Sequence, residues 1–362
     1  MTSLGFNRAL RSAVNQRLSE LGESRAGGAG MLLKLGLLLV NFAFWYALTL
    51  RLGPAHFALA CLSNLAQALA LVTLMLAVMH DGSHSAFSEH ASLNRLAKWL
   101  LVLAGGSAIG WHEEHVVRHH SNTNVPGLDS DLESGGLLRF HRAQPWRPFH
   151  RFQHLYAWAL YAIVSFKWTW FEDFDDVLGN RYGYSLRKRL GHTLEVVVAK
   201  CCQVALFVVV PARCFGLGKA LVLYFTHFVA VSLAMALTFV LAHLSGVQAM
   251  PRTRRDAPDD WAEFQLASSA NFATHNRALT WLLGGLNYQI EHHLFPHLSH
   301  RHYPMVSEIV RRLAAERGLA YHEFPSMLAA LRAHAAHLNA LGAAEAHDSG
   351  LRSQPPSAAD PA

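Results

Sequence analysis

The chain has 362 residues, of which 52% are hydrophobic and only 15% are charged, against about a quarter in an average protein. The formal net charge is +6, but the basic residues flank long apolar segments. This pattern indicates a membrane protein and does not fit the basic stripe of a soluble nucleic-acid-binding domain. The 4 cysteines lie in apolar runs without C-x-x-C spacing, so we expect neither a disulfide framework nor thiolate metal ligands.

The sequence begins with a polar segment, residues 1–30, which lacks the apolar core and cleavage site of a secretory signal peptide. Four later segments reach the length of about 20 apolar residues that a membrane-crossing helix needs. Two shorter apolar runs, residues 99–110 and 155–166, predict interfacial or buried helices. The four predicted spans are residues 31–50, 55–79, 196–215 and 220–242.

The loop inside each pair of spans is very short, so the spans form two hairpins. The N-terminus, residues 80–195 and the chain after the fourth span then lie on one side, which also holds most of the Lys and Arg and is therefore predicted to be cytoplasmic. We expect an all-α integral membrane protein, with four transmembrane helices in two hairpins and a cytoplasmic helical cap. The membrane domain is predicted to cover residues 31–343 and to precede a disordered tail, residues 344–362.

Histidine occurs 24 times and gathers in three clusters on the predicted cytoplasmic side. In a helix, residues three or four apart share a face, whereas the second histidine of an adjacent pair points about 100° away and could reach a second metal ion. Because the spans bring the three clusters together, we predict a metal site built from ring nitrogens. The clusters are "HDGSH" with His80 and His84, "HVVRHH" with His115, His119 and His120, and "QIEHH" with Gln289, His292 and His293.

His243 and His227 both belong to the fourth span, but only one of them is near the clusters. His243 lies at the cytoplasmic end and is a candidate ligand. His227 lies sixteen residues earlier, about 24 Å along a helix, and should not bind the metal. The isolated histidines are expected to be surface residues or hydrogen-bonded core residues: His56, His90, His141, His150, His154, His192 and His275.

The three clusters closely resemble the histidine boxes of the integral-membrane fatty acid desaturases, in the forms HxxxH, HxxxHH and QxxHH. The glutamine of "QIEHHLFP" is typical of the front-end branch (delta-5, delta-6 and delta-8 types). The stretches "HHSNTNVPGLDSDLE" and "NFATHNRALTWLLGGLNYQIEHH" look like bacterial linoleoyl-CoA-desaturase-like members. The resemblance covers about residues 30–325. It implies an oxidoreductase of lipid metabolism that uses O2 and two electrons to form a cis double bond in an acyl-CoA or acyl-lipid chain.

The resemblance also implies two iron ions held by the histidines of the boxes, with His243 as an additional ligand and no haem or flavin in this chain. Unactivated methylenes resist every amino-acid side chain, so a metal–oxygen species must remove the hydrogens, and nitrogen-bound iron suits this chemistry. Gln289 offers only a weak amide oxygen; it could bind iron directly, bind through water, or mark an open position. Supporting partners are expected among nearby polar residues, although each could instead be a solvated side chain: Asp81, Asn124, Asp129, Asp131 and Glu291.

The electrons are expected to come from a separate partner. Eukaryotic front-end enzymes usually carry a fused cytochrome b5 domain with an HPGG motif, and no HPGG occurs in this sequence. The resemblance therefore implies an external donor, ferredoxin or cytochrome b5 with its reductase. His297, His300 and His302 follow a helix-breaking proline and should leave the ligand face, for supporting or donor-docking roles. The helix-like stretch 303–317 could pack under the site or dock the donor.

The substrate is expected in an apolar tunnel, with the enzyme in a bacterial inner membrane. Arg187, Lys188 and Arg189 could meet a CoA phosphate or a lipid head group, or could simply be basic residues of the cytoplasmic side. A di-iron hydroxylase, ketolase or epoxygenase on the same scaffold is the alternative function. A metal transporter is disfavoured, because transporters place polar residues at the middle of the bilayer and these histidines lie at its edge.

Overall fold

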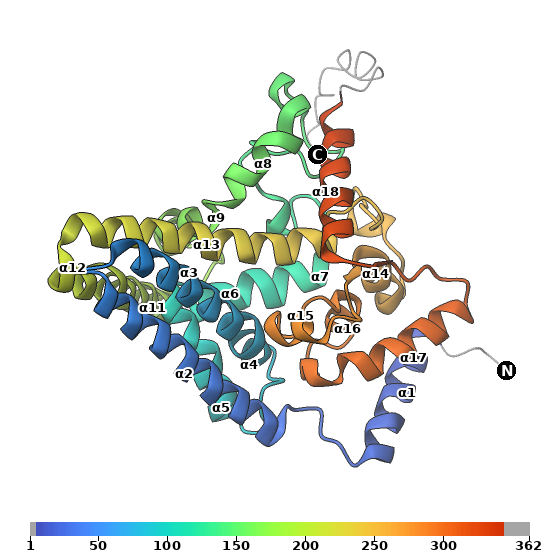
Figure 1. Cartoon of the computed structure of the whole chain (residues 1–362). Coiled ribbons are helices and arrows are strands. Elements are labelled where there is room, and N and C mark those ends of the chain that lie inside the picture. Colours follow the sequence, from blue (N-terminus) through green and yellow to red (C-terminus); the bar gives the residue numbers. More distant parts are fainter. Residues whose placement is uncertain (1–4, 344–362) are drawn as a thin grey trace.

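The computed structural model describes residues 5–343, and the predicted tail, residues 344–362, lies outside the described residues. Four helices are long and apolar enough to cross a membrane, as predicted. They form two hairpins, with residues 53–56 connecting the first pair and Gly216 alone connecting the second. The tips of both hairpins meet at the left edge of Figure 1. The helices are α2 (Gly28–Leu52), α3 (Phe57–Leu74) continued by η1 (Met75–Met79) and α4 (His80–Ser83), α11 (Leu186–Val204) continued by η7 (Ala205–Val209) and α12 (Val210–Phe215), and α13 (Leu217–His243).

The second span lies at the centre of the membrane bundle. Of its most apolar stretch, 72% is buried inside the protein, against 17% for α2. The α3 side chain of Asn64 ties this span to the fourth: its Nδ2 donates to the Leu223 carbonyl of α13 at 2.9 Å. The helix of the third span begins at Leu186, ten residues before the predicted start at 196; within this added stretch Glu195 accepts from Ser107 and Lys188 lies 3.6 Å from the Glu113 carboxylate.

The segment between the hairpins forms short helices along the same side of the bundle, where both apolar runs become helical as predicted. It also carries the second histidine cluster on a π-helical turn, η3. The elements are α5 (Ala91–Trp99), η2 (Leu100–Ala104), α6 (Ala108–Trp111), η3 (His112–His119), α7 (His120–Asn122), η4 (Ser130–Leu132), η5 (Pro148–Phe152), α8 (Gln153–Tyr161), α9 (Val164–Lys167), η6 (Trp168–Glu172) and α10 (Asp173–Gly179).

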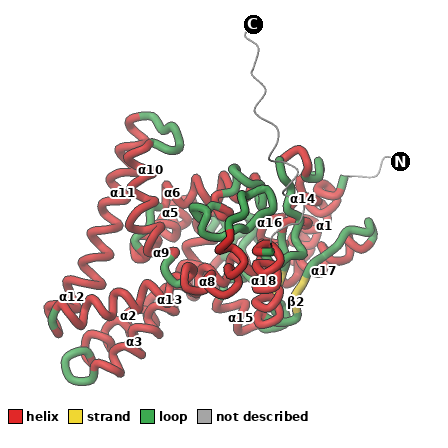
Figure 2. The backbone as a smooth tube through the Cα atoms, turned by 90° about the horizontal axis from the view of Figure 1, so that it is seen from above, coloured by secondary structure: helices red, strands yellow, loops and turns green. Residues whose placement is uncertain are grey.

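The C-terminal part forms a helical cap, at the right of Figure 1, over the ends of the spans. Figure 2 shows the almost entirely helical backbone and one of the two short strands, which pair in parallel. The cap contains η8 (Arg254–Asp256), α14 (Trp261–Ser268), β1 (Asn271–Phe272), α15 (Arg277–Leu282), α16 (Gln289–Leu294), η9 (His300–His302), α17 (Tyr303–Ala315), β2 (Glu323–Phe324) and α18 (Met327–Gly342).

The polar N-terminal segment contributes a helix to this cap, α1 (Phe6–Leu21). Its apolar side chains recur every four residues, so they share one face of the helix. All four, Phe6, Leu10, Val14 and Leu18, are buried, in a core shared with α14 and α17. The segment before the first span is therefore packed onto the cap.

Candidate metal centre

The three histidine clusters meet where the ends of the spans face the cap. The first cluster lies on α4 at the end of the second span, the second on η3 and α7, and the third on α16. A close contact of backbones brings the third cluster against the first: a Cβ on Gly284 would lie 2.4 Å from the carbonyl oxygen of Leu76 in η1. Gly284 has φ +58°, so glycine serves both the turn and this approach.

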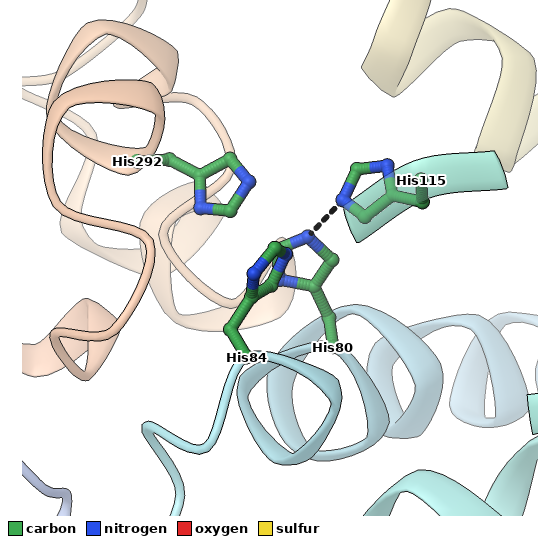
Figure 3. A group of neighbouring side chains, drawn as sticks. All are labelled: His80, His84, His115 and His292. Carbon is green, nitrogen blue, oxygen red and sulfur yellow. Dashed lines mark hydrogen bonds between the residues drawn. The ribbon is translucent and has the colours of Figure 1, made fainter. Parts of the chain in front are cut away.

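Four histidines form the first ligand group, with ring nitrogens that all lie within 4.8 Å of one another. Figure 3 shows His80 and His84 rising from one helix, while His115 and His292 point toward them from opposite sides. The Nε2 atoms of His80 and His115 are only 3.0 Å apart. Such convergence of imidazole rings can hold a metal ion.

A second group adjoins the first and consists of His119, His243 and His293. The Nε2 atoms of His293 and His243 lie 3.1 Å apart. His120 lies between the two groups, because its nitrogen also falls within 4.8 Å of those of His292 and His293. The eight predicted histidines are thus brought together in two adjoining groups.

The position of His120 differs from the expectation that the second histidine of a pair turns about 100° away. The backbone N–H of His120 bonds to the carbonyl of His115, five residues earlier, as in a π-helix. The rings of His115 and His120 are therefore only 4.9 Å apart between centroids. The π-helical turn directs three histidines of one short segment into the same space.

Several of these nitrogens are buried without any partner among the described residues: both of His84, both of His120, and the Nε2 atoms of His119 and His292. A buried polar atom without a hydrogen bond costs about 1–3 kcal/mol, so six in one place call for a ligand. Burial, with neighbouring histidines, holds the pKa values of His84, His120 and His292 well below their usual range. These rings are therefore neutral near pH 7, as metal ligands must be.

Four of the histidines share one orientation, in which Nδ1 is held from outside and Nε2 points into the centre. Such outer partners fix the ring and its tautomer. The partners are the Asp129 carboxylate for His119 at 3.1 Å, the Ser268 carbonyl for His243 at 3.1 Å, the Tyr303 hydroxyl for His292 at 3.1 Å, and the Gln265 amide oxygen for His293 at 2.8 Å.

Of the predicted supporting residues, three lie beside the second group. Burial alone would lower the pKa of His119, but Asp129 and Asp131 outweigh burial and raise it to about 9, so binding of a metal ion at its Nε2 would release a proton. Asn124 donates from Nδ2 to the carbonyls of His243 and Ser268, at 3.2 and 3.1 Å. Its backbone N–H donates to Asp129 at 2.8 Å, so the loop after the second cluster is tied to the fourth span.

Asp81 and Glu291 occupy more distant positions. Within residues 5–343, neither is hydrogen-bonded to a histidine of the three clusters. Asp81 instead accepts from His300 Nδ1 and Ser299 Oγ, both at 2.9 Å. Glu291 accepts from Asn271 at 2.7 Å and the Tyr321 hydroxyl at 2.9 Å, and both carboxylates thus brace the backbone around the centre.

Sequence reasoning missed Gln265, Ser268 and Tyr303 as partners of the ligand histidines. None of them belongs to a histidine cluster, so only the tertiary structure identifies them. Tyr303 begins the stretch 303–317, for which the sequence left two roles open: packing under the site or docking the electron donor. Gln289 is buried beside the His243 ring, and its Nε2 has no partner among the described atoms.

The other histidines lie apart from the ligand groups. His227 is buried and stacks on Phe207, with ring centroids 4.4 Å apart, inside the membrane bundle. His297 Nδ1 lies 2.7 Å from the carbonyl oxygen of His84. His302 Nε2 lies 2.9 Å from the Ser24 carbonyl. These contacts resemble the supporting roles that were expected after the helix-breaking proline.

An apolar cavity of about 370 Å³ ends at the ligand groups. Its walls come from the second and fourth spans and from the short helices between the hairpins, with Met75, Val231 and Phe239 among them. His115 of the first ligand group and His243 of the second also line it. The cavity therefore offers a hydrocarbon chain a path from the membrane bundle to the centre.

Comparison with known proteins identifies the family. The model of the fatty acid desaturases matches residues 53–325. The chain belongs to the fatty acid desaturase family. It is 29% identical to the sn-1 linoleoyl-lipid 6-desaturase of Synechocystis sp., over 94% of this chain and 96% of that enzyme. It is 27% identical to the sn-1 linoleoyl-lipid 6-desaturase of Arthrospira platensis, over 92% and 91% of the two chains.

A further relative is the acyl-lipid (8-3)-desaturase of the moss Physcomitrium patens, 30% identical over 74% of this chain and 57% of the moss enzyme. These matches confirm the predicted family and its front-end, bacterial character. The protein is thus a membrane oxidoreductase that desaturates fatty acyl chains, and its histidine groups can hold metal.

Proposed function

We propose that this desaturase holds two iron ions in its two histidine groups and forms a cis double bond in an acyl chain attached to a lipid. One iron would be held by His80, His84, His115 and His292, the other by His119, His243 and His293, with His120 available to either. The observation that carries this proposal is the set of buried, partnerless ring nitrogens in the two groups, which border an apolar cavity through His115 and His243.

Bound iron supplies the activation of O2 that removal of hydrogen from a methylene requires. The overall reaction consumes CH2–CH2, O2, two electrons and two protons, and yields CH=CH and two water molecules. The protein's own contribution is positional. The cavity walls would hold the acyl chain beside the centre, and Asp129, Gln265 and Tyr303 fix the ligand rings.

The substrate that we propose is a linoleoyl-type lipid, which the enzyme would desaturate at carbon 6. It is supported by the names of two relatives that match this chain almost from end to end. An external one-electron donor, ferredoxin or cytochrome b5, would reduce the irons. The distribution of Lys and Arg supports a cytoplasmic centre in a bacterial inner membrane.

The test is expression of the chain in a bacterial host that lacks polyunsaturated lipids, supplied with acyl chains of several lengths. Mass spectrometry should locate a new double bond at carbon 6 of a linoleoyl chain, and purified protein should contain two irons per chain. His293→Ala should lose both iron and product. An oxygenated product in place of the double bond would refute desaturation and support the hydroxylase alternative.

A further inference from the structure

A second cavity opens beside the first histidine cluster. Its volume is about 500 Å³, it is open to the surface, and it shares no lining residue with the apolar cavity. Gly82 and Ser83, which stand between His80 and His84 in the sequence, form part of its wall. One turn of backbone therefore separates this surface from two candidate iron ligands.

His297 connects this wall to the centre. Its ring is exposed and lines the cavity, and its Nδ1 lies 2.7 Å from the carbonyl oxygen of His84. An exposed side chain thus contacts the backbone of a buried candidate ligand directly. A path from the surface cavity to the ligand group that runs through His297 and His84 therefore includes a single hydrogen bond, between the His297 ring and the His84 backbone.

The cavity is basic. Arg25, Arg95 and Lys98 line it, against one carboxylate, Glu89. Within residues 5–343, none of the three cations forms an ion pair with a carboxylate. Their charge is therefore available to an acidic partner.

The other basic run on this side, residues 187–189, is partly engaged within the protein. Lys188 lies 3.6 Å from the Glu113 carboxylate. Arg189 donates to the carbonyls of Val177 and Leu178. The cavity beside His84 is thus the better candidate for binding an external anionic surface.

We propose that the basic cavity around Arg25, Arg95, Lys98 and His297 is the docking surface for a small acidic protein that carries single electrons. The inference rests on the proposed function, because the reaction needs two electrons from outside. Each carrier molecule would be oxidised by one electron and the iron centre reduced by one, twice per double bond. Because the two cavities are separate, the carrier can bind while an acyl chain occupies the other.

The experiment uses the full chain in lipid nanodiscs, with a plant-type [2Fe–2S] ferredoxin, its reductase and NADPH as the probe, and a parallel arm with cytochrome b5 and its reductase. The double variant Arg95→Glu/Lys98→Glu should raise the KM for the carrier at least about tenfold at low salt. The difference should shrink toward 1 M salt, where the Debye length falls to about 3 Å. The matched control, Arg255→Glu/Arg332→Glu, changes the charge equally at exposed sites outside the cavity and should change KM less than about twofold.

Two further measurements keep the outcomes distinct. Carbodiimide should cross-link Lys98 to carboxylates of the carrier. A single turnover driven by dithionite needs no carrier, so it measures the function of the iron centre and the substrate cavity alone. Neither of these contains Arg95 or Lys98. An unchanged carrier KM in the cavity variant, or cross-links confined to Lys188, would overturn the docking proposal. Failure of the wild-type protein to form a double bond even with dithionite would instead overturn the proposed function.

Discussion

The Asp129→Asn substitution tests whether the outer partners of the histidines hold the centre together. Asp129 is 1% exposed and accepts three hydrogen bonds. Its Oδ1 receives His119 Nδ1 and the Asp131 backbone N–H, both at 3.1 Å, and its Oδ2 receives the Asn124 backbone N–H at 2.8 Å. An amide has one oxygen in place of two, so at least one of these donors must lose its acceptor.

The structure sets the size of the effect. A hydrogen bond to a charged group contributes about 1.5–3 kcal/mol, and this is the expected loss in the free energy of unfolding. The neutral amide also stabilises a donating Nδ1 on His119 less than the carboxylate does. Loss of an outer partner commonly weakens metal binding about 10–100-fold. We expect Asp129→Asn to release one iron of two at a chelator concentration at least tenfold below that needed for the wild type.

The assay is iron content after equilibration with increasing chelator, alongside thermal unfolding in the same nanodiscs. Asp131→Asn is the matched control, because its side chain is 49% exposed and lies 3.3 Å from the same Nδ1. Its effect on iron retention should be several-fold smaller. If Asp129→Asn keeps both irons through the whole titration, or if Asp131→Asn loses iron first, the assigned role of Asp129 is wrong.

Four other substitutions test the remaining parts of the structure. Tyr303→Phe removes the partner of His292 Nδ1 and should weaken iron retention about tenfold with little change in unfolding. Gly284→Ala places a Cβ 2.4 Å from the Leu76 carbonyl and should cost about 1–3 kcal/mol of stability, measured by thermal unfolding. Met235→Trp narrows the apolar cavity and should depress turnover of long acyl chains more than of short ones, by mass spectrometry of products. Lys200→Met leaves the buried Asp173 carboxylate without its partner and should cost about 3–5 kcal/mol, recovered in part by Lys200→Met/Asp173→Leu.

Each of these four has an outcome that contradicts it. Full iron retention in Tyr303→Phe would show that the hydroxyl does not orient His292. A Gly284→Ala variant as stable as the wild type would exclude the close backbone approach. If Met235→Trp lowers turnover equally for acyl chains of all lengths, the cavity does not hold the acyl chain. A double variant at Lys200 and Asp173 that is no more stable than Lys200→Met alone would mean that the buried pair is not the cause of the loss.

The spans and the ligand residues could be predicted because their signals are local. Uncharged runs of helical length identify membrane helices, and histidines spaced three or four apart share a face. The predicted start of the third span, residue 196, lies ten residues after the start of its helix, because the charged residues 187–189 and Glu195 look like the flank of a membrane segment. In the structure Glu195 accepts from Ser107 at 2.9 Å and Lys200 pairs with Asp173, so both are satisfied internally.

The outer partners could not be predicted because nothing in the sequence near them marks their role. Gln265 lies 28 residues before His293, yet the Nδ1 of His293 and the Gln265 amide oxygen are 2.8 Å apart. The burial of α1 was different, because its signal was present and was overlooked. Phe6, Leu10, Val14 and Leu18 recur at four-residue intervals in a segment whose average composition is polar.

Gln289 explains why the two ligand groups are not equivalent. The first group has four imidazoles, whereas the second has three, and Gln289 is buried beside His243 of this second group. An amide oxygen is a weaker ligand than an imidazole nitrogen for iron, so if Gln289 completes the second group, we expect that group to bind its iron less tightly. The outer partners are concentrated there accordingly: Asp129, Ser268 and Gln265 hold all three of its rings. A site with one weak donor depends more on ring orientation, and for this reason the second iron should be the first to leave when Asp129 is changed.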